Sequence, residues 1–185
     1  MISFEKGESY AIPIEVLKQG LYEAIMNEPR KDWIIALFEY YILEKTPDTI
    51  AETLNSMFSE KYRKKISSGD IIAAAYMGGF LAKGLIFASH YISNAVGRFL
   101  ITEKGYHVSG TDKYDFISDT NELVELKIRR RTEIPGLGYF STEMLEMVKT
   151  GLKGKLLMLV ITKKNGKSQV TMHQYRLVKT ESIIV

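Results

Sequence analysis

The run Leu-Leu-Met-Leu-Val-Ile at residues 156–161 is apolar without interruption, and it constrains the fold more than any other segment. A strand with one wet face alternates apolar and polar residues, whereas a short unbroken apolar run is typical of a strand covered on both faces. The turn signal Asn165-Gly166 follows, and residues 170–178 then read as a partner strand. The run therefore predicts an α/β fold in which a central sheet has structure packed on each side.

Two further apolar stretches, residues 113–117 and 122–128, lie on either side of a polar turn and predict a β-hairpin. Because strand residues alternate between faces, a one-residue slip would turn the apolar side chains of either strand to the wrong side. Pairing Phe116 with Val124 places an aromatic and a β-branched side chain together on the core face. This register leaves residues 119–121 as a three-residue loop, a common hairpin length.

The same register sets Ile117 opposite Leu123 and Asp115 opposite Glu125. Two directly opposed acids repel each other and need a compensating charge. Mg²⁺ takes oxygen ligands and is often held by one or two carboxylates together with a substrate phosphate. Lys127 shares a face with Glu125, where its ammonium can contact a phosphate or polarise an attacking water. The patch predicts a metal-assisted hydrolytic site; a solvated hairpin with an ordinary charged face is the alternative.

The elements on either side of the hairpin extend the pattern. Upstream, an apolar stripe at helical spacing ends before Gly105, a plausible helix stop, and residues 106–108 read as a short extended segment. Downstream, Ser141 or Thr142 can cap a helix that ends near Gly151. The expected order is therefore helix, three strands, helix and two strands.

This order, together with Asp115 and the triplet Glu125-Leu126-Lys127, resembles the PD-(D/E)XK nuclease superfamily over about residues 90–180. The acid on the second core strand of that family matches Asp115, and its (D/E)-x-K signature matches the triplet. The resemblance implies a restriction-endonuclease-like core, which is a mixed central sheet flanked by helices. It also implies Mg²⁺-dependent hydrolysis of nucleic-acid phosphodiesters, with Mn²⁺ as a substitute.

In that family reading, Asp115, Glu125 and the backbone carbonyl of Leu126 ligate the metal, and Lys127 positions or activates the water. The sequence departs from the signature at Tyr114, which stands where the signature has proline. Many members also carry an acid on the first core helix, where this chain has Ser93-Asn94. Asn94 is therefore a candidate extra oxygen ligand.

Within the superfamily, the small archaeal Holliday-junction resolvases and the nucleases of archaeal viruses look nearest. That likeness implies a homodimer that acts on DNA, including branched DNA, inside a cell or a virus-infected host cell. The choice between DNA and RNA, between branched and linear substrates, between endo and exo cleavage, and between one and two metal ions stays open.

The formal net charge of +3 conceals a difference between the two halves of the chain. Residues 1–89 carry 10 Lys and Arg against 12 Asp and Glu, whereas residues 90–185 carry 15 against 10. Cations around the candidate site would hold phosphates against the metal, although a solvated strand end would look the same. The candidate nucleic-acid-binding residues are Lys113, Arg129, Arg130 and Arg131.

Composition excludes several other chemistries. The chain has no cysteine, which rules out disulfides, thiolate catalysis and thiolate-bound zinc. His90, His107 and His173 are dispersed without metal-site spacing, and neither a Gly-rich phosphate loop nor a serine-nucleophile motif occurs. The first residues lack a signal-peptide pattern, so a cytoplasmic location is expected.

Residues 71–92 are nearly all apolar and long enough to be weighed as a membrane span. Lys83 in the middle of this stretch is costly in a bilayer, and its glycines and alanines suit close helix packing. We therefore expect a buried helix, at a dimer interface, and no membrane partner.

Residues 1–89 are expected to form an all-helical N-terminal extension or dimerisation region, and residues 90–185 the nuclease-like core. Helical patterns occupy residues 14–26, 33–42 and 46–58, and residues 67–70 cap a further helix.

Two rival functions remain compatible with these patterns. The first is a nucleic-acid-binding module that keeps the fold without the chemistry, which the missing helix acid favours. The second is a structural or interaction protein, membrane-associated through residues 71–92.

Overall fold

The computed structural model describes residues 1–27, 29, 31–41, 45–58, 64–77, 93–129, 131–165 and 167–181. Contacts between residues divide the chain into two compact units. One unit comprises residues 1–17 and 96–185, and the other comprises residues 18–95.

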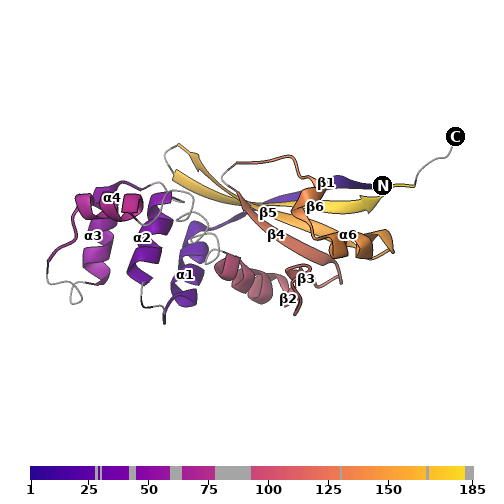
Figure 1. Cartoon of the computed structure of the whole chain (residues 1–185), viewed down its shortest axis with the longest axis horizontal. Coiled ribbons are helices and arrows are strands. Elements are labelled where there is room, and N and C mark those ends of the chain that lie inside the picture. The colour runs from indigo at the N-terminus through magenta and orange to yellow at the C-terminus, as the bar shows by residue number, and fades with distance from the viewer. Residues whose placement is uncertain are drawn as a thin grey trace. The chain divides into compact units, whose positions relative to one another are not determined.

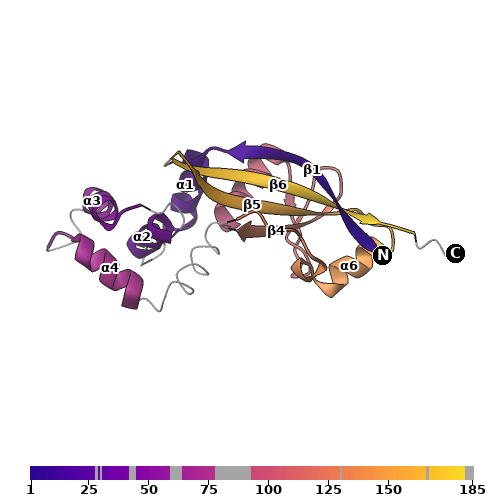
Figure 2. The ribbon, with the colours of Figure 1, turned by 90° about the horizontal axis from the view of Figure 1, so that it is seen from above.

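In the first unit, the described strands form one six-stranded sheet in the order β1-β6-β5-β4-β3-β2 (Figure 1). The strands are β1 (Ile2–Ile12), β2 (His107–Val108), β3 (Phe116–Ile117), β4 (Leu123–Arg129), β5 (Gly154–Lys164) and β6 (Lys167–Lys179). Only β4 and β5 are parallel among the described neighbours, so the sheet is mixed. Figure 2 shows β1, β6, β5 and β4 side by side in this order. The predicted α/β class with a mixed sheet is confirmed.

The crossover between the parallel strands β4 and β5 contains helix α6 (Thr142–Lys149). Parallel neighbours need such a connection because a tight turn cannot join them. Ser141 is the N-cap, and its hydroxyl accepts a 3.1 Å hydrogen bond from the N–H of Met144. Gly151 ends this region with a φ of 108°, a conformation that glycine adopts without a side-chain clash. The predicted cap and stop are confirmed.

Both faces of the sheet are covered. On one face, Met144 and Val148 of α6 share a buried cluster with alternate residues of β5. On the other face lies the part of the helix at residues 93–104 that belongs to this unit, residues 96–104, where a Cβ on Gly97 would come within 3.2 Å of the Phe116 ring. Residues 156–161 of β5 are consequently all buried, as the unbroken apolar run predicts.

The prediction of an all-helical N-terminal extension is wrong for its first residues, because Ile2–Ile12 is strand β1. It pairs antiparallel with β6, from Ile2 opposite Lys179 to Ile12 opposite Val170. Its centre is polar and exposed, as suits a strand at the edge of a sheet. The helical pattern begins only at Ile14, after Pro13.

The remaining described helices are α1 (Ile14–Ala24), α2 (Lys31–Tyr41), α3 (Pro47–Met57) and α4 (Ser68–Met77). Thr46 caps α3 by accepting a 3.3 Å hydrogen bond from the N–H of Thr49, and Ile50 and Leu54 are fully buried. The starts of α1, α3 and α4 agree with the predicted helices, and α2 begins two residues before the predicted range. None of the helices in the described ranges is long and apolar enough to cross a membrane. Most of the apolar stretch at 71–92, including Lys83 and His90, lies outside the described residues.

Candidate metal centre

The hairpin of β3 and β4 has the predicted register. Phe116 lies opposite Val124 and Ile117 opposite Leu123. The N–H of Ser118 donates a 2.9 Å hydrogen bond to the carbonyl of Glu122, which closes the loop at residues 119–121. Asn121 has a φ of 61°, the left-handed conformation that a three-residue hairpin loop needs and that asparagine tolerates.

Asp115 lies just beyond the last ladder pair rather than in a regular pair with Glu125. Its N–H donates a 2.9 Å hydrogen bond to the carbonyl of Val124. Its carboxylate oxygen Oδ2 accepts a 2.7 Å hydrogen bond from the N–H of Leu126. The exposed carboxylate of Asp115 is therefore fixed on the backbone of the triplet that the sequence singled out.

Glu125 and Lys127 share the face of β4 that also carries Leu123, whose side chain lies in the cluster with α6. The Nζ of Lys127 lies 2.9 Å from the Oε1 of Glu125. Their side chains are 30% and 12% exposed, so the pair is partly screened from water. These two predicted catalytic residues are in direct contact.

The pKa of Glu125 is raised above its ordinary value of 4.5. Burial is the main cause, and the negative charge of Asp115 raises the pKa further. The hydrogen bond and charge of Lys127 act in the opposite direction. The two carboxylates are therefore near enough to repel each other, and a cation between them would relieve that repulsion.

The backbone of Leu126 offers a third oxygen. In a strand, the N–H and C=O groups of one residue point to the same side, because a hydrogen-bonded pair exchanges both bonds. The N–H of Leu126 points to Asp115, so its carbonyl faces the same side. The carbonyl predicted as a ligand is thus on the side of β4 where the Asp115 carboxylate lies.

The donor set fits a hard cation, since carboxylate and carbonyl oxygens are the ligands that Mg²⁺ prefers. Within the described ranges, no three or more His, Cys, Asp and Glu side chains cluster in a way that could hold a metal ion. The protein would therefore contribute two carboxylates and one backbone oxygen. Waters and a phosphate would supply the remaining oxygen ligands.

The candidate extra ligand Asn94 is exposed in the first turn of the helix at residues 93–104. It belongs to the unit of residues 18–95, whereas the hairpin belongs to the other unit. Its part in the site stays a prediction.

The candidate phosphate contacts differ in their surroundings. Lys113 and Arg131 are exposed. Arg129 is engaged within the protein, because its Nε lies 3.0 Å from Glu133 and its guanidinium lies 5.2 Å from the centre of the Tyr139 ring. Arg130 lies outside the described residues.

Sequence reasoning did not identify Glu133 and Tyr139. Glu133 accepts hydrogen bonds from both Arg129 and the hydroxyl of Tyr139. Together the three side chains join the end of β4 to the residues just before α6. A spacing of four residues between Arg129 and Glu133 suggests a pair only on a helix, and this segment is a loop. The sequence therefore carries no signal for this cluster.

A buried lysine is a second feature that the sequence did not reveal. Lys155 of β5 pairs with Val124, so it lies on the face opposite to Glu125. Its Nζ is 3.9 Å from a carboxylate oxygen of Glu122 and 4.9 Å from the centre of the Tyr106 ring. Burial lowers the pKa of Lys155, while the charge of Glu122 acts in the opposite direction.

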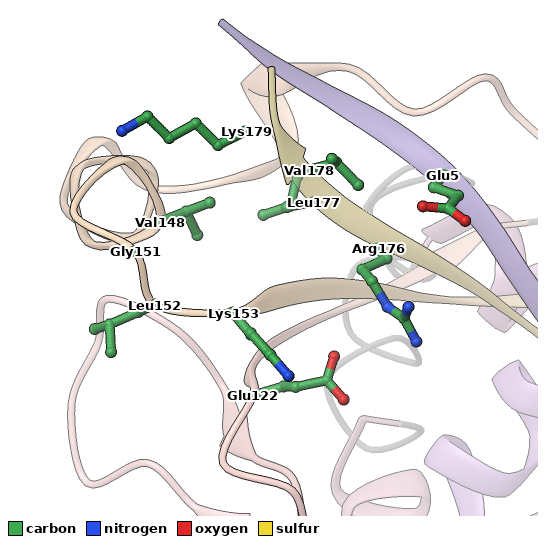
Figure 3. A pocket seen from close by; sticks show the side chains of 10 residues that line it. All are labelled: Glu5, Glu122, Val148, Gly151, Leu152, Lys153, Arg176, Leu177, Val178 and Lys179. Atoms are coloured by element: carbon green, nitrogen blue, oxygen red, sulfur yellow. The ribbon is translucent and has the colours of Figure 1, made fainter. Parts of the chain in front are cut away.

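A cavity of about 420 Å³ lies where β4 and β5 begin (Figure 3). Val148, Leu152 and Leu177 line one side of it, and the charged ends of Glu122, Lys153 and Arg176 gather on the other. None of the three candidate catalytic residues lines this cavity. The candidate centre lies elsewhere, at Asp115 just before β3 and at Glu125 and Lys127 on β4.

Comparison with known proteins identifies no relative of this chain. No protein-family model matches the chain, and neither a curated protein nor a solved structure matches it.

Proposed function

We propose that this protein is a metal-dependent nuclease that resembles the PD-(D/E)XK superfamily. The observed order of elements supports this reading: the helix at residues 93–104, then β2, β3, β4, α6, β5 and β6. That order agrees with the one from which the resemblance was drawn. The restriction-endonuclease-like identity of the core is part of the proposal.

The observation that carries the proposal is the hydrogen bond from the Leu126 N–H to the Asp115 carboxylate. It anchors the first acid on the strand that bears Glu125 and Lys127. The raised pKa of Glu125, due first to burial and then to the charge of Asp115, supports the same arrangement. Asp115 from one side of the hairpin thus lies on the backbone of the strand that carries the Glu125–Lys127 pair.

The chemistry follows from the roles of these groups. Asp115, Glu125 and the Leu126 carbonyl would hold Mg²⁺ or Mn²⁺. A bound metal ion of this kind activates water and stabilises charge on a phosphate. Lys127 would exchange its contact with Glu125 for one with the attacking water or the scissile phosphate. Water is then added across the phosphorus–oxygen bond, and a strand is cut.

We propose DNA, including branched DNA, as the substrate, with phosphates held by the exposed Lys113 and Arg131. A homodimer would present two such sites to two strands. The excess of positive charge in residues 90–185 supports a polyanionic partner.

The direct test is a cleavage panel of single-stranded, duplex and four-way-junction DNA and single-stranded RNA with Mg²⁺, Mn²⁺ or EDTA. We expect metal-dependent cleavage that Asp115→Asn lowers at least about a hundredfold. Asp119→Asn, which changes an exposed acid in the hairpin loop, is the matched control and should cleave normally. Equal cleavage by the wild type and the Asp115 variant would remove the site from consideration.

The second candidate is a nucleic-acid-binding module without catalysis. Two observations favour it: the described ranges contain no cluster of three ligating side chains, and Asn94 stands where many nucleases carry an acid. Nucleic-acid binding that needs no metal, combined with no Mn²⁺ uptake in a titration, would favour this candidate over the nuclease.

A further inference from the structure

Hydrogen bonds from three places in the chain hold the short segment that carries Asp115. At Asp115 itself, the N–H of Leu126 donates to the carboxylate. Before Asp115, two serine hydroxyls donate to backbone carbonyls: Ser109 to Tyr114 at 2.5 Å, and Ser141 to Lys113 at 2.5 Å.

The Ser141 hydroxyl takes part in two bonds. It accepts from the N–H of Met144, which caps α6, and it donates to the carbonyl two residues before Asp115. One oxygen therefore joins the start of α6 to the segment that presents the acid. Replacing it removes both bonds, and the second of them is made directly to the segment that carries Asp115.

Packing supports the same connection. Tyr114 is partly buried against the cluster that contains Met144 and Val148 of α6, so a shift of α6 would also displace the Tyr114 side chain. On the side of β2, Ser109 makes two hydrogen bonds to the segment. Its hydroxyl donates to the carbonyl of Tyr114, and its N–H donates at 3.2 Å to the carbonyl of Asp115. The segment thus has fixed ends on both sides.

We infer that Ser141 is a positioning residue for the proposed metal centre, acting through the Lys113 carbonyl to hold Asp115 against Leu126. This inference rests on the proposed function, because the metal is what Asp115 would bind. Residues that orient a ligand typically change metal affinity about tenfold or more when they are removed. We expect the same scale for Ser141.

Ser141→Gly removes both bonds but costs the helix little stability, so its effect on Asp115 can be measured in a folded protein. Glycine serves nearly as well as serine at a helix N-cap, but it has no hydroxyl to donate to Lys113. We expect Mn²⁺ binding by calorimetry to weaken about tenfold in this variant. Ser141→Thr keeps both the acceptor and the donor, and it should restore wild-type affinity.

The matched control is Thr46→Ala, which removes the cap of α3 in the other unit. We expect it to lower the melting temperature by about 2–4 °C and to leave Mn²⁺ affinity unchanged. Ser109→Ala loosens the same segment without touching a helix cap. It should weaken Mn²⁺ binding in the same direction, and it serves if the Ser141 variant does not fold.

A second readout needs no metal. The Leu126 amide is protected by the Asp115 carboxylate, so its hydrogen exchange by NMR reports whether Asp115 is in place. Ser141→Gly should speed that exchange at least about fivefold, and Thr46→Ala should not. Unchanged exchange and unchanged Mn²⁺ affinity in the Ser141 variant would overturn the inference. If the wild type binds no Mn²⁺, the proposed function fails, and the exchange of Leu126 alone decides the role of Ser141.

Discussion

The ammonium of Lys127 lies 2.9 Å from the carboxylate of Glu125, on the face of β4 that α6 covers. Burial of Glu125 raises its pKa, and the lysine offsets part of that effect. The pair is therefore a contact within the folded protein. In the proposed reaction its two members have separate tasks, because Glu125 would bind the metal and Lys127 would contact the water or the phosphate.

Replacing Lys127 with methionine should separate metal binding from catalysis. The oxygens proposed as ligands remain, so Mn²⁺ affinity should change little, while single-turnover cleavage should fall at least about a hundredfold. Lys149→Met is the control, because Lys149 also lies 2.9 Å from a glutamate, Glu146, in an ion pair at the end of α6. Cleavage by the Lys127 variant within threefold of the wild type would refute its role.

Replacing Glu125 with glutamine should stabilise the protein without metal near pH 7. The folded-state pKa of Glu125 lies above its ordinary value of 4.5, so the folded state favours the protonated form. That contribution is present below about pH 4.5 and is lost as pH rises through the raised pKa. The variant avoids the loss, and we expect a gain of roughly 0.5–1 kcal/mol at pH 7 that shrinks toward pH 4.

Urea unfolding at several pH values measures this difference. Glu146→Gln is the matched control, because Glu146 is also paired with a lysine but is 62% exposed. A Glu125 variant that is less stable than wild type at pH 7 would contradict the expected sign.

Replacing the exposed Arg131 and replacing the ion-paired Arg129 should change the salt dependence of DNA binding by different amounts. Each phosphate contact that is lost lowers the slope of log affinity against log salt by about 0.9 for duplex DNA. Arg131→Ala should show a change of this size in fluorescence anisotropy, because its side chain is exposed. Arg129→Ala should change the slope less, because Glu133 already pairs with Arg129. Equal slopes for both variants would mean that the Glu133 pair does not withhold Arg129 from the substrate.

Replacing either member of the pair Glu122 and Lys155, on the other face of the sheet, should affect stability differently. Glu122→Gln leaves the ammonium of Lys155 buried without its carboxylate, and we expect a loss of about 1–3 kcal/mol. Lys155→Met removes the buried charge itself and should be near neutral or stabilising. A double-mutant cycle by urea unfolding gives the coupling between the two residues. A Lys155 variant that is less stable than the Glu122 variant would contradict this account.

Local rules made much of the hairpin predictable. The register follows from Phe116 and Val124, which need the same buried face, and Asn121 satisfies the turn. The sequence also predicts a helix cap at Ser141 or Thr142, and Ser141 is the cap. The side-chain contact of Glu125 with Lys127 follows from their spacing of two on one strand.

Other features depend on partners far away in the sequence. In β1 only the two end residues, Ile2 and Ile12, are buried, so its hydrophobic pattern is a weak signal for a strand. Its backbone pairs with β6, which lies more than 150 residues later in the sequence. The hydrogen bonds of Ser109 and Ser141 go to backbone carbonyls, which every residue has. No sequence pattern marks such an acceptor, so the hydrogen bonds that support Asp115 cannot be predicted from the sequence.

The pairing of β1 with β6 has a consequence for assembly during synthesis. Met1 and Thr180, which are hydrogen-bonded to each other, are 179 positions apart. The first strand leaves the ribosome long before its partner exists, whereas β5 and β6 form a local hairpin as soon as they are made. The nascent strand must therefore wait unpaired, and Glu5, Lys6 and Glu8 give it charges that discourage association with other chains in the interval.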